Sequence, residues 1–179
     1  MREADSGTHF TARNKYIRMC IAKALIQLLE HKNFEEITIT ALAKAANVSR
    51  MTFYKYYMSK HDVLVDFMYE MMSEYMEETK TRTDIGHFRE RKHIYHCFMF
   101  FKQYAAELMM LVKAGMYAVI INAVNDYMNL YVLPGSNYSK YELYYYAGAL
   151  CNTYIKWLEG GMVETPEEIA EIVYKHFEK

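Results

Sequence analysis

The feature that most restricts the fold is a run of three closely spaced helix starts. Residues 38–64 read TITALAKAANVSRMTFYKYYMSKHDVL. Thr38 and Ser49 are hydroxyl side chains in front of helical runs, where they can cap the free N–H groups of a first turn. Asn47 tolerates the left-handed backbone conformation that a tight turn needs. The segment therefore predicts two short helices around a turn, and a further helix that opens at a capping box over residues 59–62.

Helical spacing sorts the side chains of this segment into an inner and an outer face. Phe53 and Tyr57 lie four residues apart, share a face with Val48 and should point inward. The outer face of the same short helix then presents Arg50, Met51, Thr52, Lys55 and Tyr56, with Tyr54 on the flank. Arginine can pair with guanine edges, and lysine and tyrosine side chains suit phosphates. This set is typical of a helix-turn-helix module that places one helix in the DNA major groove.

The remainder of the chain shows helical spacing and no sustained alternation, so we predict an all-α fold of about nine helices. Only 2 of the 179 residues are proline, which leaves long helices uninterrupted. Capping signatures at residues 139–142 and 165–168 mark the starts of the last two helices. We expect a three-helix domain with the helix-turn-helix over residues 10–58 and a second helical domain over residues 59–179.

Charge is distributed unevenly between the two expected domains. The net charge of −1 by itself argues against a nucleic-acid-binding protein. Residues 1–60, however, hold ten Lys and Arg against five Asp and Glu, whereas residues 61–179 hold eleven against seventeen. A basic front end on an acidic body suits a protein that docks DNA at one end.

Cysteine usage and hydropathy indicate a cytoplasmic protein. The three cysteines are scattered, and no CxxC pair occurs, so a disulfide framework is not expected. The first ten residues hold no apolar run of the kind found in a signal peptide. The most apolar tract, residues 108–124, is interrupted by Lys113 and is short for a bilayer span. We expect no membrane partner.

The helix-turn-helix segment resembles the N-terminal domain of the TetR family of bacterial transcriptional regulators. The matching residues run from about Lys15 to Leu64, and the most specific part is TFYKYY followed by Lys60. The family usually has Gly near Asn47, a small residue near Met51 and Phe where Tyr57 stands. These departures bear on base preference rather than on the fold.

The resemblance implies which side chains meet DNA. Base contacts are implied for Thr40, Arg50, Met51 and Thr52. Phosphate or sugar contacts are implied for Thr38, Ser49, Tyr54, Lys55, Tyr56 and Lys60. The alternative for each is an ordinary solvated side chain, and capping alone is a sufficient role for Thr38 and Ser49. Lys60 stands at the amino end of a helix, whose free N–H groups would add to a phosphate clamp.

For the second domain, the resemblance implies dimerisation. The stretch YIKWLEGGMVETPEEIAEIV, residues 154–173, resembles the last two helices of a Firmicutes-type subgroup of the family. These helices would pair with the same helices of a second copy. The interface candidates are Tyr154, Ile155, Trp157, Ile169, Ile172 and Val173. A two-fold homodimer would present two reading helices about 34 Å apart, so the double-stranded DNA site should be near-palindromic.

The resemblance also implies that the second domain often holds a small-molecule effector. Met and aromatic side chains at helical spacing could line an apolar pocket for it. The candidates are Met71, Met72, Tyr75, Phe98, Phe101 and Met110. The alternative is plain core packing, because such a stripe belongs to the core of most helical proteins. The identity of the effector stays open.

The sequence offers little support for a catalytic site or a metal site. His93 and Cys97 lie four residues apart on one helical face, but three cations between residues 89 and 92 disfavour a bound metal. The sequence has no Gly-rich phosphate loop, nucleophile elbow or paired-carboxylate arrangement. We expect no metal, no cofactor and no enzyme activity.

The expected function is a homodimeric, DNA-binding transcriptional regulator of the bacterial cytoplasm. A repressor that a small molecule releases or modulates is favoured over an activator. The alternative is a protein-interaction module on the same fold, for which DNA binding is secondary.

Overall fold

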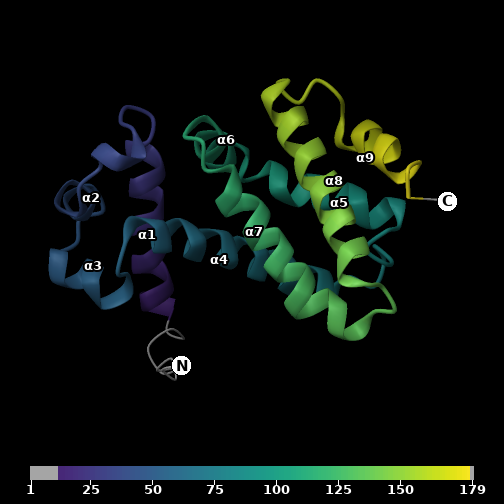
Figure 1. Cartoon of the computed structure of the whole chain (residues 1–179), viewed down its shortest axis with the longest axis horizontal. Helices are drawn as coiled ribbons and strands as arrows, with labels where there is room; N and C mark the ends of the chain where they lie inside the picture. Colours follow the sequence, from purple (N-terminus) through teal and green to yellow (C-terminus); the bar gives the residue numbers. More distant parts are fainter. Residues whose placement is uncertain (1–11, 178–179) are drawn as a thin grey trace. The chain divides into compact units, whose positions relative to one another are not determined.

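The computed structural model describes residues 12–177, which form nine α-helices and no strand, so the predicted all-α class is confirmed (Figure 1). The first half contains α1 (Ala12–Leu28), the 3-10 turn η1 (Phe34–Glu36), α2 (Ile39–Ala45), α3 (Arg50–Tyr56) and α4 (Lys60–Thr81). The second contains α5 (Arg91–Lys102), α6 (Ala105–Lys113), α7 (Tyr117–Tyr127), η2 (Met128–Val132), η3 (Leu133–Gly135), α8 (Lys140–Glu159) and α9 (Pro166–Tyr174).

The chain divides into two compact units, Met1–Phe67 and Met68–Lys179, with the division inside α4. The expected helix-turn-helix domain, residues 10–58, belongs to the first unit, and its first two residues lie outside the described part of the chain. None of the helices in the described part is long and apolar enough to cross a bilayer.

Two hydroxyl caps and one left-handed residue shape the helix-turn-helix. The Thr38 side chain accepts a hydrogen bond from the Ala41 N–H at the start of α2. Ser49 does the same for the Thr52 N–H at the start of α3, at 2.9 Å. Between the two helices Asn47 has a φ of 53°, as the turn requires. The predicted caps and turn are therefore confirmed.

A polar tie across three elements fixes α3 on the first unit. Phe53 and Tyr57 are buried, as their spacing predicts. The Tyr57 hydroxyl donates to Asp66 Oδ2 on α4 at 2.6 Å. The other oxygen of the same carboxylate, Oδ1, accepts from Arg18 Nη1 of α1 at 2.5 Å. Because Arg18 is only 5% exposed, this carboxylate compensates a charge inside the unit.

In the second unit, α7 packs along α8, and α9 lies against α5 (Figure 1). Reciprocal capping boxes start α8 at Ser139 and Glu142 and α9 at Thr165 and Glu168, as the sequence predicts. At the end of α7 the chain continues as one π-helical segment, η2. Such segments displace side chains from the regular helical rows and are frequent at functional sites.

Candidate nucleic-acid interface and interior cavity

The outer face of α3 carries five of the ten side chains that the sequence assigned to DNA. Arg50, Met51, Tyr54 and Lys55 are exposed, and Met51 reaches 85% exposure. Thr52 is half-buried because its hydroxyl lies 2.9 Å from Ser49 Oγ inside the cap. Single exposed apolar side chains such as Met51 are common on protein surfaces, so this exposure does not by itself indicate a partner. The first turn of α3 presents one cation and one uncovered apolar group side by side.

Tyr56 differs from the expectation. Its spacing placed the side chain on the outer face, but it is half-buried and its hydroxyl donates to Asn14 Oδ1 of α1 at 2.9 Å. The hydroxyl proton is therefore not available to a phosphate oxygen. Tyr56 anchors the end of α3 to α1, while Lys55 Nζ lies 5.6 Å above its ring.

Lys60 also has an intramolecular partner. Its Nζ donates to the Phe34 carbonyl oxygen at 2.5 Å and lies 4.5 Å from the centroid of the Phe34 ring. An ammonium group has three protons, so two of them remain for an anion. Asp62 Oδ2 accepts from the N–H groups of Met58 and Ser59, which precede α4, and the Asp62 N–H of the first turn donates to Ser59 Oγ.

The remaining predicted DNA contacts lie on or beside α2. Thr38 and Thr40 are both exposed, and Ser49 is exposed at the start of α3. The Oγ atoms of Thr38 and Ser49 each accept a capping hydrogen bond, and Ser49 Oγ shares a further one with Thr52 Oγ1, so a hydroxyl proton is left for another acceptor at Thr38 and at one member of the Ser49–Thr52 pair. Capping and a phosphate contact are thus compatible for these two residues.

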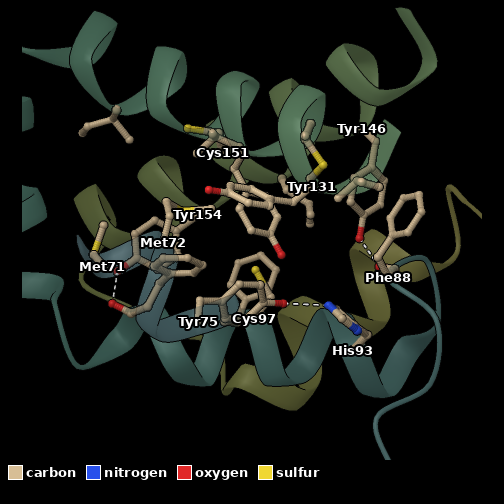
Figure 2. A pocket seen from close by; sticks show the side chains of 18 of the residues that line it. Met71, Met72, Tyr75, Phe88, His93, Cys97, Tyr131, Tyr146, Cys151 and Tyr154 are labelled. Carbon is tan, nitrogen blue, oxygen red and sulfur yellow. Dashed lines mark hydrogen bonds between the residues drawn. The ribbon is translucent and has the colours of Figure 1, made fainter. Parts of the chain in front are cut away.

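A cavity of about 330 Å³ lies inside the second unit. Its wall is built from α4, the segment before α5, α5, α6, α7, η2, η3 with the residue after it, and α8 (Figure 2). Five of the six predicted pocket residues line it: Met71, Met72, Tyr75, Phe98 and Phe101. Met110 is not among the lining residues, although the neighbouring Leu108 on the same helix is.

One polar pair in the cavity wall joins α4 to α5. The Tyr75 hydroxyl lies 2.8 Å from His93 Nε2, and His93 Nδ1 lies 3.2 Å from the Gly86 carbonyl oxygen (Figure 2). Burial lowers the pKa of His93, so the ring is neutral near pH 7. Because a carbonyl can only accept, the proton is assigned to Nδ1, and Nε2 accepts from Tyr75.

Two further tyrosines in the wall direct their hydroxyl groups at backbone carbonyls. Tyr146 donates to the Phe88 oxygen, and Tyr154 donates to the Phe101 oxygen at 2.8 Å. Burial raises the pKa of both tyrosines. Burial also raises the pKa of the Cys97 thiol to about 12 and that of Cys151 to about 11. At neutral pH the phenols and the thiols are therefore uncharged, and neither thiol is a nucleophile.

Sequence reasoning did not identify His93, Tyr146 and Tyr154 as lining residues. A signal was available, since a tyrosine within an apolar helical stripe needs a hydrogen-bond partner for its hydroxyl. Their partners, however, are backbone carbonyls or side chains distant in the sequence, which no local pattern reveals.

The candidate interface residues are mostly buried within their own chain. Tyr154, Ile155, Trp157, Ile169 and Val173 are each at most 9% exposed, and only Ile172 is exposed, at 50%. Trp157 Nε1 donates to the Glu164 oxygen at 2.9 Å, which folds the connection after α8 back onto it. The apolar stripes of α8 and α9 pack within the unit, so a second copy would meet other side chains of these helices.

His93 and Cys97 do not form a metal centre with a third ligand. Within residues 12–177 no group of three or more His, Cys, Asp and Glu side chains is arranged to hold a metal ion. Both ring nitrogens of His93 already have hydrogen-bond partners.

Comparison with known families assigns both units. The profile of bacterial regulatory proteins of the tetR family matches residues 21–66. The profile of a transcriptional regulator C-terminal region matches residues 86–179, more than half of the 179 residues. None of the curated proteins matches the chain significantly.

Solved structures share the fold at low sequence identity. Lin0861 from Listeria innocua superposes with a TM-score of 0.78 at 16% identity, over 98% of this chain and 93% of that one. FadR from Bacillus subtilis, solved with stearoyl-CoA, gives 0.58 at 14% identity, over 89% and 96%. Thermus thermophilus FadR, a transcriptional repressor solved with lauroyl-CoA, gives 0.54 at 19% identity, over 89% and 92%.

Proposed function

This chain belongs to the TetR family of bacterial regulatory proteins, and we propose that it is a homodimeric repressor that a small molecule releases from a near-palindromic DNA site. The family consists of transcriptional regulators and not of enzymes. The observation that carries the proposal is the outer face of α3, where Arg50, Met51 and Lys55 are exposed on a helix held from behind by Phe53 and Tyr57.

We assign the DNA contacts by the chemistry of each exposed group. Base edges are met by Thr40, Arg50, Met51 and Thr52. Phosphates are met by Thr38, Ser49, Tyr54, Lys55 and Lys60. Tyr56 is left out of the phosphate set because its proton is used by Asn14. An arginine at a helix start can reach guanine edges with two parallel hydrogen bonds, which gives Arg50 the largest share of base preference.

We infer dimerisation from the short length of DNA that one α3 helix can contact. A single α3 covers one half-site, so two copies related by a two-fold axis would read inverted half-sites. We propose that the second copy meets exposed side chains of α8 and α9, Ile172 among them. A closed interface of this kind would fix the separation of the two α3 helices.

The cavity supports the proposal of a small-molecule effector. Two FadR proteins with this fold were solved with acyl-CoA molecules. In this chain α4 lines the cavity with Met68, Met71, Met72 and Tyr75, and the same helix carries Lys60 and Asp66 nearer its start. A ligand that binds one setting of α4 more tightly than another would shift the population that binds DNA.

The test is selection of bound sequences from a random duplex library, followed by affinity titration. We expect an enriched site with inverted half-sites. Arg50→Ala should weaken binding at least tenfold and broaden the preference at one position of each half-site. Lys55→Ala should weaken all sequences alike and reduce the slope of log affinity against log salt by about one per phosphate contact.

Lys113→Ala is the matched control, because Lys113 is an exposed cation at the end of α6 in the second unit. Its removal should leave the affinity unchanged. A library with no enriched sequence, or an Arg50→Ala protein that behaves like the control, would contradict the proposal. The first of these results would favour the protein-interaction alternative.

A further inference from the structure

We propose that the interior cavity takes a neutral, mostly apolar molecule that donates one hydrogen bond, such as a phenol or an alcohol, and excludes carboxylates and cations. The inference rests on the proposed function only in treating this ligand as the effector. The chemical class itself follows from the wall of the cavity.

The buried part of the wall offers no charge that could compensate a charged ligand. Among the described residues, no Asp, Glu, Lys or Arg lines the cavity. The imidazole of His93 is held neutral by burial, which lowers its pKa, and by the position of its two hydrogen-bond partners. An ion that leaves water for such a site loses its hydration without gaining a partner. Both a carboxylate and an ammonium are therefore disfavoured.

The polar atoms that remain in the wall are hydrogen-bond acceptors. The hydroxyl protons of Tyr75, Tyr146 and Tyr154 are directed at His93 Nε2 and at the carbonyl oxygens of Phe88 and Phe101 (Figure 2). Each phenol oxygen keeps lone pairs that can accept a further hydrogen bond. A ligand with a hydrogen-bond donor finds an acceptor in these oxygens. A ligand that can only accept would face their lone pairs and would gain no hydrogen bond.

The other polar groups of the wall do not reverse this conclusion. The Tyr127 hydroxyl hydrogen-bonds the Thr79 side chain, and Ser136 Oγ donates to the Leu133 oxygen. Tyr131 and His87 are exposed, so their donors can interact with water. The thiols of the cavity cysteines are weak donors.

The volume limits the size of the ligand. About 330 Å³ lies at the lower end of the range of about 300–1,000 Å³ that is usual for ligand pockets. The wall is dominated by Met and aromatic side chains, which adapt to a flat or flexible apolar body. An alkylphenol fits this description, whereas the phosphates of a CoA molecule would have no cation in the wall to meet.

The experiment compares four probes with one shared skeleton, titrated into the full chain by calorimetry. These are 4-butylphenol, 4-butylanisole, 4-butylbenzoate and 4-butyl-N,N,N-trimethylanilinium. The phenol should bind at least tenfold more tightly than the anisole, in which a methyl group replaces the donated proton. The benzoate, which is ionised at neutral pH, and the anilinium, which is permanently charged, should each bind at least tenfold more weakly than the phenol.

Three substitutions locate the acceptor, namely Tyr75→Phe, Tyr146→Phe and Tyr154→Phe. At least one should weaken phenol binding about fivefold and leave anisole binding unchanged, as expected for the loss of one hydrogen bond. The anisole serves as the internal check on folding, because a collapsed cavity would lose both probes. Tyr141→Phe is the matched control, since Tyr141 is 70% exposed and does not line the cavity.

Equal affinity for the phenol and the anisole, tight binding of either charged probe, or no binding of any probe would overturn the inference. DNA binding of the ligand-free protein is measured separately. If the ligand-free protein does not bind DNA while the phenol binds as expected, the proposed function fails and the ligand class stands. If the phenol binds without changing the DNA affinity, the effector role fails and the ligand class again stands.

Discussion

Asp66 holds two side chains from different helices with its two carboxylate oxygens. One oxygen faces Arg18 of α1, and the other accepts from Tyr57 at the end of α3. Tyr57 stands where the family usually has phenylalanine, and its extra hydroxyl is used in this contact. Helix α3 is therefore held both by the packing of Phe53 and by the Tyr57–Asp66 hydrogen bond, which a phenylalanine at this position could not form.

Asp66→Asn should lower the free energy of unfolding by roughly 2–3 kcal/mol, because it leaves the buried Arg18 without its carboxylate. Tyr57→Phe removes the hydrogen bond to Asp66 and should cost about 1 kcal/mol. Urea titrations followed by circular dichroism measure both changes. A loss below about 0.5 kcal/mol for Asp66→Asn, the range of ordinary surface substitutions, would refute the structural role assigned to this residue.

The Arg18–Asp66 contact could not be predicted from the sequence. Its partners lie 48 residues apart, and no local pattern marks an arginine that will be buried. By contrast, Thr38 and Ser49 could be recognised because each cap and the N–H group it binds lie within three residues. The same reason explains the error at Tyr56. Helical spacing predicts an outward side chain, but no local pattern indicates that its hydroxyl binds Asn14, which lies 42 residues away.

At the scale of elements, the geometry of the turn between α2 and α3 depends on Asn47. A φ of 53° is unfavourable for most side chains, and asparagine tolerates it better than alanine does. The N–H of the next residue, Val48, closes the turn by donating to the Ala43 oxygen at 2.9 Å. The turn therefore fixes the crossing of the two helices by backbone conformation as well as by packing.

Asn47→Ala should destabilise the first unit by about 1 kcal/mol, because alanine resists the left-handed conformation. Asn47→Gly, the residue usual in the family, should be close to neutral, because glycine adopts this conformation without steric cost. Thermal unfolding of the two variants and the parent protein compares them directly. Equal stability of the alanine and glycine variants would show that this backbone angle does not limit stability.

The last two helices, α8 and α9, show that an apolar sequence pattern predicts burial but not the surface that covers it. Their capping boxes marked the correct starts, and the sequence predicts that their apolar residues meet a second copy. A stripe does not show whether its own chain or a second copy covers it. Here α9 lies against α5 of the same chain, so Ile169 and Val173 are buried without a partner subunit.

At the scale of the whole molecule, one half-buried and one buried histidine, His93 and His96, link stability to pH. Burial lowers the pKa of both His93 and His96 below the ordinary value of 6.5. As the pH falls below about 6.5, the unfolded chain therefore binds protons that the folded chain resists. The stability is fully present above this pH and is lost on acidification through the folded-state pKa values.

The free energy of unfolding should therefore fall between pH 7 and pH 5, and His93→Gln should remove part of that fall. Urea titrations at several pH values measure the slope. His31→Gln is the control, because the His31 side chain is 82% exposed at the end of the first helical region. An unchanged slope in His93→Gln would exclude His93 as a source of the pH dependence.

The single tryptophan has a practical consequence. Trp157 packs edge-to-face on Phe98 at 5.6 Å between ring centroids, and Phe98 lines the cavity. Indole emission responds to the polarity and motion of its immediate neighbours. A guest that displaces Phe98 should thus alter the fluorescence of the unlabelled chain, so occupancy can be followed in real time, without a dye and without DNA. The fold supplies its own optical probe one side chain away from the cavity.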